Sequence, residues 1–172
     1  MAQFERTTER LTLRRVRMSD LPAFAALENA LRAAENRAPA DEAESARYLG
    51  RFTAVWERGD LGYWAVELDG RVVGFGGVQP HGDAWNLYYR VDPVLHDRGI
   101  ATEVAREAVR AAAQARPDWT VRCETRPWNT AAIRVAERAG LTRVEDHDGY
   151  AVLEVHPAER GSRRSSPRSG HP

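Results

Sequence analysis

The most constraining feature of the sequence is a strand that runs through a short loop into a long amphipathic helix. The strand ends at Tyr89-Arg90-Val91, and the loop passes through Gly99-Ile100-Ala101 into the helix. The first peptide N–H groups of a helix lack intrahelical partners and carry the positive end of its dipole, so this junction can bind an anion without cationic side chains. Gly99 lets the backbone approach a ligand, and Ala101 is too small to block one. The junction predicts a phosphate site at residues 96–102.

Two common classes of phosphate-binding protein are disfavoured. The nucleoside-triphosphate loop G-x-x-x-x-G-K-[ST] requires a lysine, and all 25 basic residues of this chain are arginine. The glycine cluster at residues 74–77 is followed by Val78 and Gln79, so it does not fit the G-x-G-x-x-G pattern of dinucleotide-binding folds. Neither a kinase nor a Rossmann cofactor is expected.

Three segments together resemble the GNAT superfamily of N-acetyltransferases. Residues 96–101, His-Asp-Arg-Gly-Ile-Ala, are similar to its [QR]-x-x-G-x-[GA] pyrophosphate loop. Asn129-Thr130-Ala131-Ala132, followed by residues 136–141, is similar to the second half of its cofactor site. The opening residues 8–14, with Asp20, resemble the branch that contains the RimJ/RimL-like ribosomal-protein acetyltransferases. The resemblance covers about residues 7–155 and implies an enzyme that uses acetyl-coenzyme A and no metal.

The resemblance also implies roles for individual residues. Pantetheine would pair with the strand that ends at Val91, which is expected to bulge and to splay from the strand at 119–125, and the Val91 N–H would be the oxyanion donor. Asn129 could bind the cofactor or cap a helix, and both roles can coexist. The implied cofactor-binding residues are Tyr89, Val91, His96, Asp97, Arg98, Gly99, Ile100, Ala101, Thr102 and Asn129.

Two positions depart from the family pattern. His96 stands where Gln or Arg is usual, so its contact to the pyrophosphate is expected to be weaker or to depend on histidine protonation, while the backbone cradle is kept. Ala136 stands where many relatives have a tyrosine that protonates the departing thiolate, an absence that is common in the ribosomal-protein branch.

The base that deprotonates the acceptor is the least defined part of the site. Glu124 lies on the strand beside the expected thioester and could take a proton directly or through water, or could instead pair with an arginine. Cys123 is expected to be a small core residue, because an acyl-cysteine would need a nearby base and an exposed thiol. The five histidines lack metal-ligand spacing, so no metal site is expected.

Composition favours one globular domain. The chain has 172 residues, of which 42% are hydrophobic, so we expect a single domain over residues 1–157 and a disordered, mildly basic tail over 158–172. The formal net charge is zero, which argues against nucleic-acid binding. The single cysteine, the lack of a signal-peptide core and the lack of an apolar run near the ~20 residues that span a bilayer favour a cytoplasmic protein without membrane contact.

Hydrophobic periodicity and turn residues predict an α+β fold with a mixed, mostly antiparallel central sheet flanked by helices. Asp69-Gly70 predicts a tight type I′ hairpin turn, and Ser19 or Asp20 is expected to cap the first helix. Strands are expected at 11–16, 63–68, 71–75, 85–91, 119–125, 142–145 and 150–155, and helices at 21–31, 41–57, 100–115 and 129–139.

The favoured function is transfer of an acetyl group to a primary amine, on a small molecule or a protein N-terminus, by direct attack in a ternary complex. The resemblance implies that the helical region at 20–60 walls the acceptor pocket and that a homodimer is plausible. The alternative is a non-catalytic acyl-coenzyme A sensor or scaffold, which Ala136 and the undefined base keep open.

Overall fold

The computed structural model describes residues 4–156, so the predicted tail at 158–172 lies outside the described residues. These residues form one mixed sheet of eight strands, in the order β1-β2-β3-β4-β5-β6-β8-β7, with four α-helices. Within the described chain, β5 and β6 are parallel and the other neighbouring strands antiparallel. This arrangement confirms the predicted fold class.

The elements follow the predicted order. The strands are β1 (Arg6–Thr7), β2 (Leu11–Arg15), β3 (Trp64–Leu68), β4 (Arg71–His81), β5 (Ala84–Val91), β6 (Val121–Thr125), β7 (Thr142–Arg143) and β8 (Ala151–Val155). The α-helices are α1 (Leu21–Ala34), α2 (Glu42–Glu57), α3 (Ile100–Ala115) and α4 (Thr130–Ala139), and the short 3-10 helices are η1 (Met18–Asp20) and η2 (Pro93–Leu95). Strand β1 and the two 3-10 helices were not predicted.

The hairpin between β3 and β4 has the predicted turn. Asp69 has φ 51° and Gly70 has φ 75°, the two positive values that a type I′ turn requires. The conformation of this turn therefore follows from local residue preferences.

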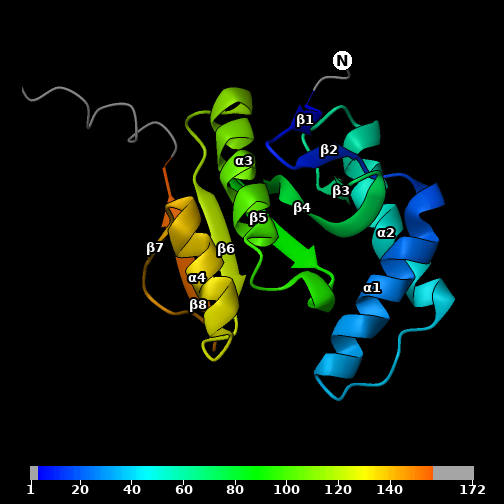
Figure 1. Cartoon of the computed structure of the whole chain (residues 1–172). Helices are drawn as coiled ribbons and strands as arrows, with labels where there is room; N and C mark the ends of the chain where they lie inside the picture. Colours follow the sequence, from blue (N-terminus) through cyan, green and yellow to red (C-terminus); the bar gives the residue numbers. More distant parts are fainter. Residues whose placement is uncertain (1–3, 157–172) are drawn as a thin grey trace, which may run out of the picture.

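The helices cover both faces of the sheet (Figure 1). The ring of Phe75 in β4 packs edge-on against Phe24 of α1, with 5.1 Å between centroids. A Cβ atom at the next position, Gly76, would lie 3.0 Å from Val104 of α3. Successive strand residues point to opposite faces, so α1 and α2 lie on one face, and α3 and α4 lie on the other.

The core fills the space between the helices and the sheet. The side chains of Trp64 and Trp85 are almost fully buried, and burying a large apolar side chain contributes about 1.5–3 kcal/mol. Helix α3 meets the sheet through buried alanines, among them Ala105, Ala108 and Ala112. Small residues on this face let the helix pack closely, which fixes the position of its N-terminus.

The expected cap at the start of α1 is not formed by a side chain. Asp20 occupies the N-cap position, but its carboxylate accepts hydrogen bonds from Arg14 (2.8 and 2.9 Å) and from the Arg17 amide (2.8 Å). Burial alone would raise the pKa of Asp20, and these bonds outweigh it and hold the pKa below its usual value. An ion pair between Asp20 and Arg14 of β2 therefore takes the place of the predicted cap.

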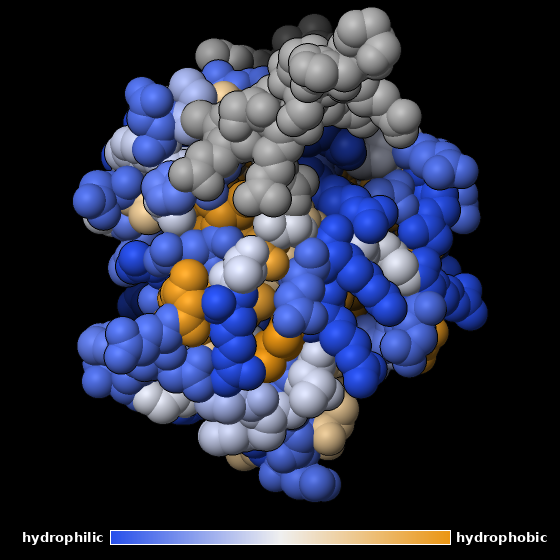
Figure 2. Space-filling model, turned by 90° about the vertical axis from the view of Figure 1, so that its left-hand side faces the viewer, coloured by the Kyte–Doolittle hydropathy of each residue, from blue (hydrophilic) through white to orange (hydrophobic). Residues whose placement is uncertain are grey.

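The face shown in Figure 2 is mainly hydrophilic. Viewed from the side that is on the left in Figure 1, apolar residues show only in small areas between hydrophilic ones (Figure 2). Among the described residues, no helix combines the length and the apolar character needed to cross a bilayer.

Candidate functional site

The loop before α3 forms a cradle of backbone amides. Asp97 and Gly99 both have positive φ, 62° and 76°, and Gly99 is the N-cap of α3 without a side chain to cap it. The amide of Glu103 bonds to the Gly99 carbonyl (3.0 Å), so the amides of residues 100–102 precede the hydrogen-bonded part of the helix. A Cβ atom added at Gly99 would meet nothing closer than Arg10 Nη2 at 3.6 Å, which leaves the space above the amides open. The arrangement fits a diphosphate.

A network from the first hairpin holds this cradle in place. Arg10 donates from Nη1 to the Arg98 carbonyl (2.9 Å) and forms an ion pair with Glu103 (2.6 Å), which also accepts a bond from the Thr8 hydroxyl. Burial alone would raise the pKa of Glu103, but the hydrogen bonds from Thr8 and Arg10 outweigh this effect and lower the pKa.

Arg10 and Glu103 were not identified from the sequence as part of the site. The available signal was a carboxylate in the first turn of a helix expected to bind an anion, which needs a cationic partner.

Strands β5 and β6 separate beside the cradle. They pair at Trp85 with Val121 and at Asn86 with Arg122, and beyond this point β5 stays paired with β4 while β6 stays paired with β8. Because each strand is tied to a different neighbour, a gap opens between residues 87–91 and 123–125. The predicted splay is confirmed.

The predicted bulge in β5 is wrong. The register between β4 and β5 is continuous from Gly74–Val91 to His81–Ala84. A Cβ atom at Gly74 would lie 2.5 Å from the Arg90 carbonyl oxygen, so the glycine lets the two backbones stay close and in register.

The backbone of Val91 faces the gap. The Asp92 amide donates to the Val73 carbonyl (2.9 Å), which makes this a hydrogen-bonded pair and the adjacent Val91–Gly74 pair a non-hydrogen-bonded one. The N–H and C=O of Val91 therefore point away from β4, towards β6. His96 Nε2 lies 3.0 Å from the Val91 carbonyl oxygen, so the loop histidine is held at the mouth of the gap.

Two further predicted cofactor residues lie around the gap. Tyr89 donates its hydroxyl to the Ala132 carbonyl (2.6 Å) and lies 3.5 Å from Cys123 Sγ, so this side chain connects β5 to α4. Burial raises the pKa of the Tyr89 hydroxyl, which keeps it protonated. Asn129 caps α4 through Oδ1, which accepts from the Ala132 amide (3.1 Å), and its Nδ2 donates to no group in the described residues. The predicted cap is confirmed, and Nδ2 remains available to a ligand.

Glu124 and Cys123 point to opposite faces of β6. Cys123 is buried, and burial raises the pKa of its thiol, as expected for an unreactive core residue. Glu124 is exposed on the face that carries α1 and α2, and it forms no ion pair within residues 4–156. The described residues hold no cluster of side chains suited to a metal ion.

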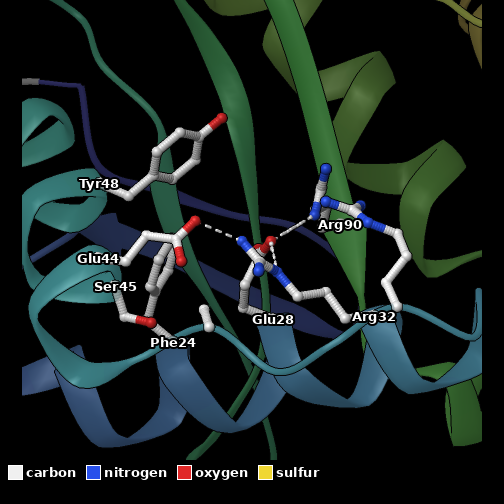
Figure 3. A pocket seen from close by; sticks show the side chains of 9 residues that line it. Phe24, Glu28, Arg32, Glu44, Ser45, Tyr48 and Arg90 are labelled. Carbon is white, nitrogen blue, oxygen red and sulfur yellow. Dashed lines mark hydrogen bonds and ion pairs between the residues drawn. The ribbon is translucent and has the colours of Figure 1, made fainter.

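A second site, the α1–α2 pocket, lies on the same face (Figure 3). It has a volume of about 200 Å³, and Arg90 of β5 reaches into it. Its ion pairs run from Arg90 to Glu28 (3.0 Å), from Glu28 to Arg32 (3.4 Å) and from Arg32 to Glu44 (2.6 Å). The pocket is lined by Phe24, Glu28, Arg32, Arg37, Ala40, Glu44, Ser45, Tyr48 and Arg90. Sequence reasoning placed the acceptor wall in this helical region but missed Arg90.

Most of the chain matches one known protein family. The family model described as the acetyltransferase (GNAT) domain matches residues 10–142. No curated protein sequence matches the chain.

Solved structures share the fold at low sequence identity. An acetyltransferase from Agrobacterium tumefaciens is 24% identical, with a TM-score of 0.76 over 91% of this chain and 96% of the other. RimJ from Mycobacterium smegmatis, solved with a coenzyme A disulfide, is 20% identical, with a TM-score of 0.68 over 87% of each chain. RimL, a ribosomal alpha-N-protein acetyltransferase solved with coenzyme A, is 18% identical, with a TM-score of 0.71 over 89% and 98%.

The family match spans well over half of the chain and contains the amide cradle, the gap beside Val91 and the cap at Asn129. The chain therefore belongs to the GNAT acetyltransferase family and is an acyltransferase that uses acetyl-coenzyme A.

Proposed function

We propose that this protein transfers an acetyl group to a primary amine, on a small molecule or a protein N-terminus, by direct attack within a ternary complex. The observation that carries the proposal is that the amide cradle at 100–102 and the Val91 N–H adjoin one gap in the sheet. The α1–α2 pocket opens on the face of the sheet towards which Glu124 points. These positions support a site at which the acyl donor, the group that polarises its carbonyl and the acceptor amine would meet.

The residues of the cradle bind and orient the donor. Acetyl-coenzyme A supplies an acyl thioester when it is bound. The amides of residues 100–102 would hold its diphosphate, and the free edge of β5 would pair with the pantetheine. The Nδ2 group of Asn129 would be a further hydrogen-bond donor to the pantetheine. Holding donor and acceptor side by side lowers the entropic part of the barrier.

Val91 is proposed to polarise the thioester carbonyl through its backbone N–H. A fixed donor beside the developing negative charge is worth on the order of 10²–10³ in rate. Because the neighbouring Asp92 amide is tied to β4, the direction of the Val91 N–H is set by the sheet and not by a mobile side chain. The donor is thus preorganised.

Glu124 is proposed as the group that takes the proton from the acceptor amine, directly or through water. Its side chain is exposed and free of ion pairs within residues 4–156, and it extends from β6 towards the acceptor side of the gap. Ala136 is fully buried, so the position that carries a tyrosine acid in many relatives cannot supply a proton here.

An ordinary assay tests the proposal. The purified chain is incubated with acetyl-coenzyme A and a panel of alkylamines, amino acids and short peptides, and release of the free thiol is measured, with calorimetry reporting cofactor binding. Amine-dependent thiol release is expected. Cofactor binding without release for every amine would contradict catalysis and favour a sensor or scaffold.

A further inference from the structure

The α1–α2 pocket presents more hydrogen-bond donors than its own carboxylates use. Glu28 accepts two contacts from Arg90 Nη1 (3.0 and 3.2 Å) and one from Arg32 Nε (3.4 Å). Glu44 accepts from Arg32 Nη2 at 2.6 Å. The Nε and Nη2 groups of Arg90 make no hydrogen bond within the part of the chain described. Both carboxylates are neutralised while guanidinium donors remain.

A buried hydroxyl in the same pocket also lacks a partner. Ser45 is 2% exposed, and its Oγ forms no hydrogen bond to any described residue. Buried hydroxyls are nearly always hydrogen-bonded, because burial without a partner is costly. Figure 3 shows Ser45 and Tyr48 on the α2 side of the pocket, opposite Arg90. The unpaired hydroxyl indicates that a polar ligand group completes this pocket.

Arg37 also lines the pocket, and its guanidinium could leave its present ion pair to bind a ligand. Its ion pair with Glu35 (3.0 Å) is exposed on both sides, at 52% and 60%, and exposed pairs of this kind are weak. Glu35 does not line the pocket. Three arginines and two glutamates therefore line the cavity, which favours an anionic ligand group.

The pocket lies next to the expected site of transfer. Arg90 directly precedes Val91, and adjacent Cα atoms are about 3.8 Å apart. The Arg90 side chain points to the α1–α2 face, while the Val91 N–H points into the gap. A carboxylate bound at the Arg90 guanidinium would thus lie about one arginine side chain away from the backbone that borders the gap.

We infer that the acceptor amine also carries a carboxylate, which is bound by Arg90, Arg37 and the Ser45 hydroxyl. The planar guanidinium fork matches the two oxygens of a carboxylate. The source is either a free amino acid or an acidic side chain near a peptide N-terminus. This inference rests on the proposed acetyl transfer.

Matched pairs of acceptors test the inference. Each ω-amino acid from glycine to aminohexanoate is compared with the alkylamine of equal chain length, and amidated Ser-Asp is compared with amidated Ser-Asn. Charge-assisted contacts predict a kcat/KM at least about tenfold higher for the carboxylate member of a pair. The two series distinguish a free amino acid from a peptide. Equal kcat/KM within every pair would overturn the inference but leave acetyl transfer standing.

Variants assign the effect to the pocket. Arg37→Gln and Ser45→Ala should each reduce the carboxylate preference, which is the ratio of the two kcat/KM values within a pair, severalfold. Arg51→Gln is the control, because Arg51 is an exposed arginine on the same helix α2 as Ser45 and does not line the pocket. A preference that survives both pocket variants would contradict the assignment.

A binding measurement gives a readout that does not need turnover. N-acetylated amino acids and their carboxamides are titrated by calorimetry into the protein saturated with coenzyme A. The carboxylates should bind about tenfold more tightly, and Arg37→Gln should reduce this difference severalfold. Equal affinities would overturn the carboxylate site. Selective binding without thiol release from any amine would keep that site and contradict the proposed transfer.

Discussion

The Nε2 atom of His96 lies 3.0 Å from the carbonyl oxygen of Val91, and this contact joins the loop of the amide cradle to the end of β5. The two parts of the proposed cofactor site, the amides of 100–102 and the free edge of the strand, are thereby held at a fixed separation. His96, which departs from the family pattern, thus connects the loop before α3 to the end of β5.

Replacing His96 tests this role. A hydrogen bond of this kind contributes about 0.5–1.5 kcal/mol, so His96→Ala should weaken acetyl-coenzyme A binding by roughly 2- to 12-fold in calorimetry. His96→Gln, which introduces a residue usual in the family and keeps a side-chain donor, should recover part of the loss. Identical affinities for all three proteins would show that the contact has no part in binding.

Replacing Gly99 tests the amide cradle. Gly99→Val places a branched side chain over the amides at a φ of 76°, so cofactor binding should be lost in calorimetry. Gly59 is a matched control, because it has a φ of 79° and open space around it but lies at the end of α2. Gly59→Val should lose comparable thermal stability and keep its affinity for acetyl-coenzyme A. Normal binding by Gly99→Val would refute the site.

The parts of the fold that the sequence predicted are those set by local chemistry. The positive φ values at Asp69 and Gly70, and the cap of α4 at Asn129, follow from residue preferences within a few positions. The gap between β5 and β6 was expected by resemblance alone, since it arises from the pairing of each strand with a different neighbour.

The missed contacts join residues far apart in the chain. Arg10 and Glu103 are 93 positions apart, and Arg90 and Glu28 are 62 apart. With 25 arginines and 25 acidic residues, the sequence offers too many equivalent pairs to choose between. The expected Asp20 cap failed for a different reason, because Arg14, six positions before it, and the Arg17 amide donate to the carboxylate instead.

The buried Asp20 carboxylate should make stability depend on pH. Its pKa in the folded protein lies below the ordinary value of 3.8, so it contributes stability above that value and loses it as the pH falls through the folded pKa. Urea unfolding between about pH 6 and pH 3 should show a steeper loss of unfolding free energy for the unmodified protein than for Asp20→Asn. Asp83→Asn, in the exposed turn between β4 and β5, is the control and should follow the unmodified protein. Parallel curves for all three would contradict the role of Asp20.

Glu124 gives the most direct test of the chemistry. Removing a general base lowers the rate by roughly 10²- to 10⁴-fold, so Glu124→Gln should reduce kcat by that order while the affinity for acetyl-coenzyme A is kept, since no cradle contact is changed. Glu145→Gln, another exposed glutamate that lies outside the gap, should keep full activity. If Glu124 takes the proton, the glutamine variant should also recover rate as the pH is raised, because more of the acceptor amine is then already deprotonated. A kcat within about twofold of the unmodified protein at neutral pH would show that Glu124 is not the base and that the amine loses its proton to water or to another group.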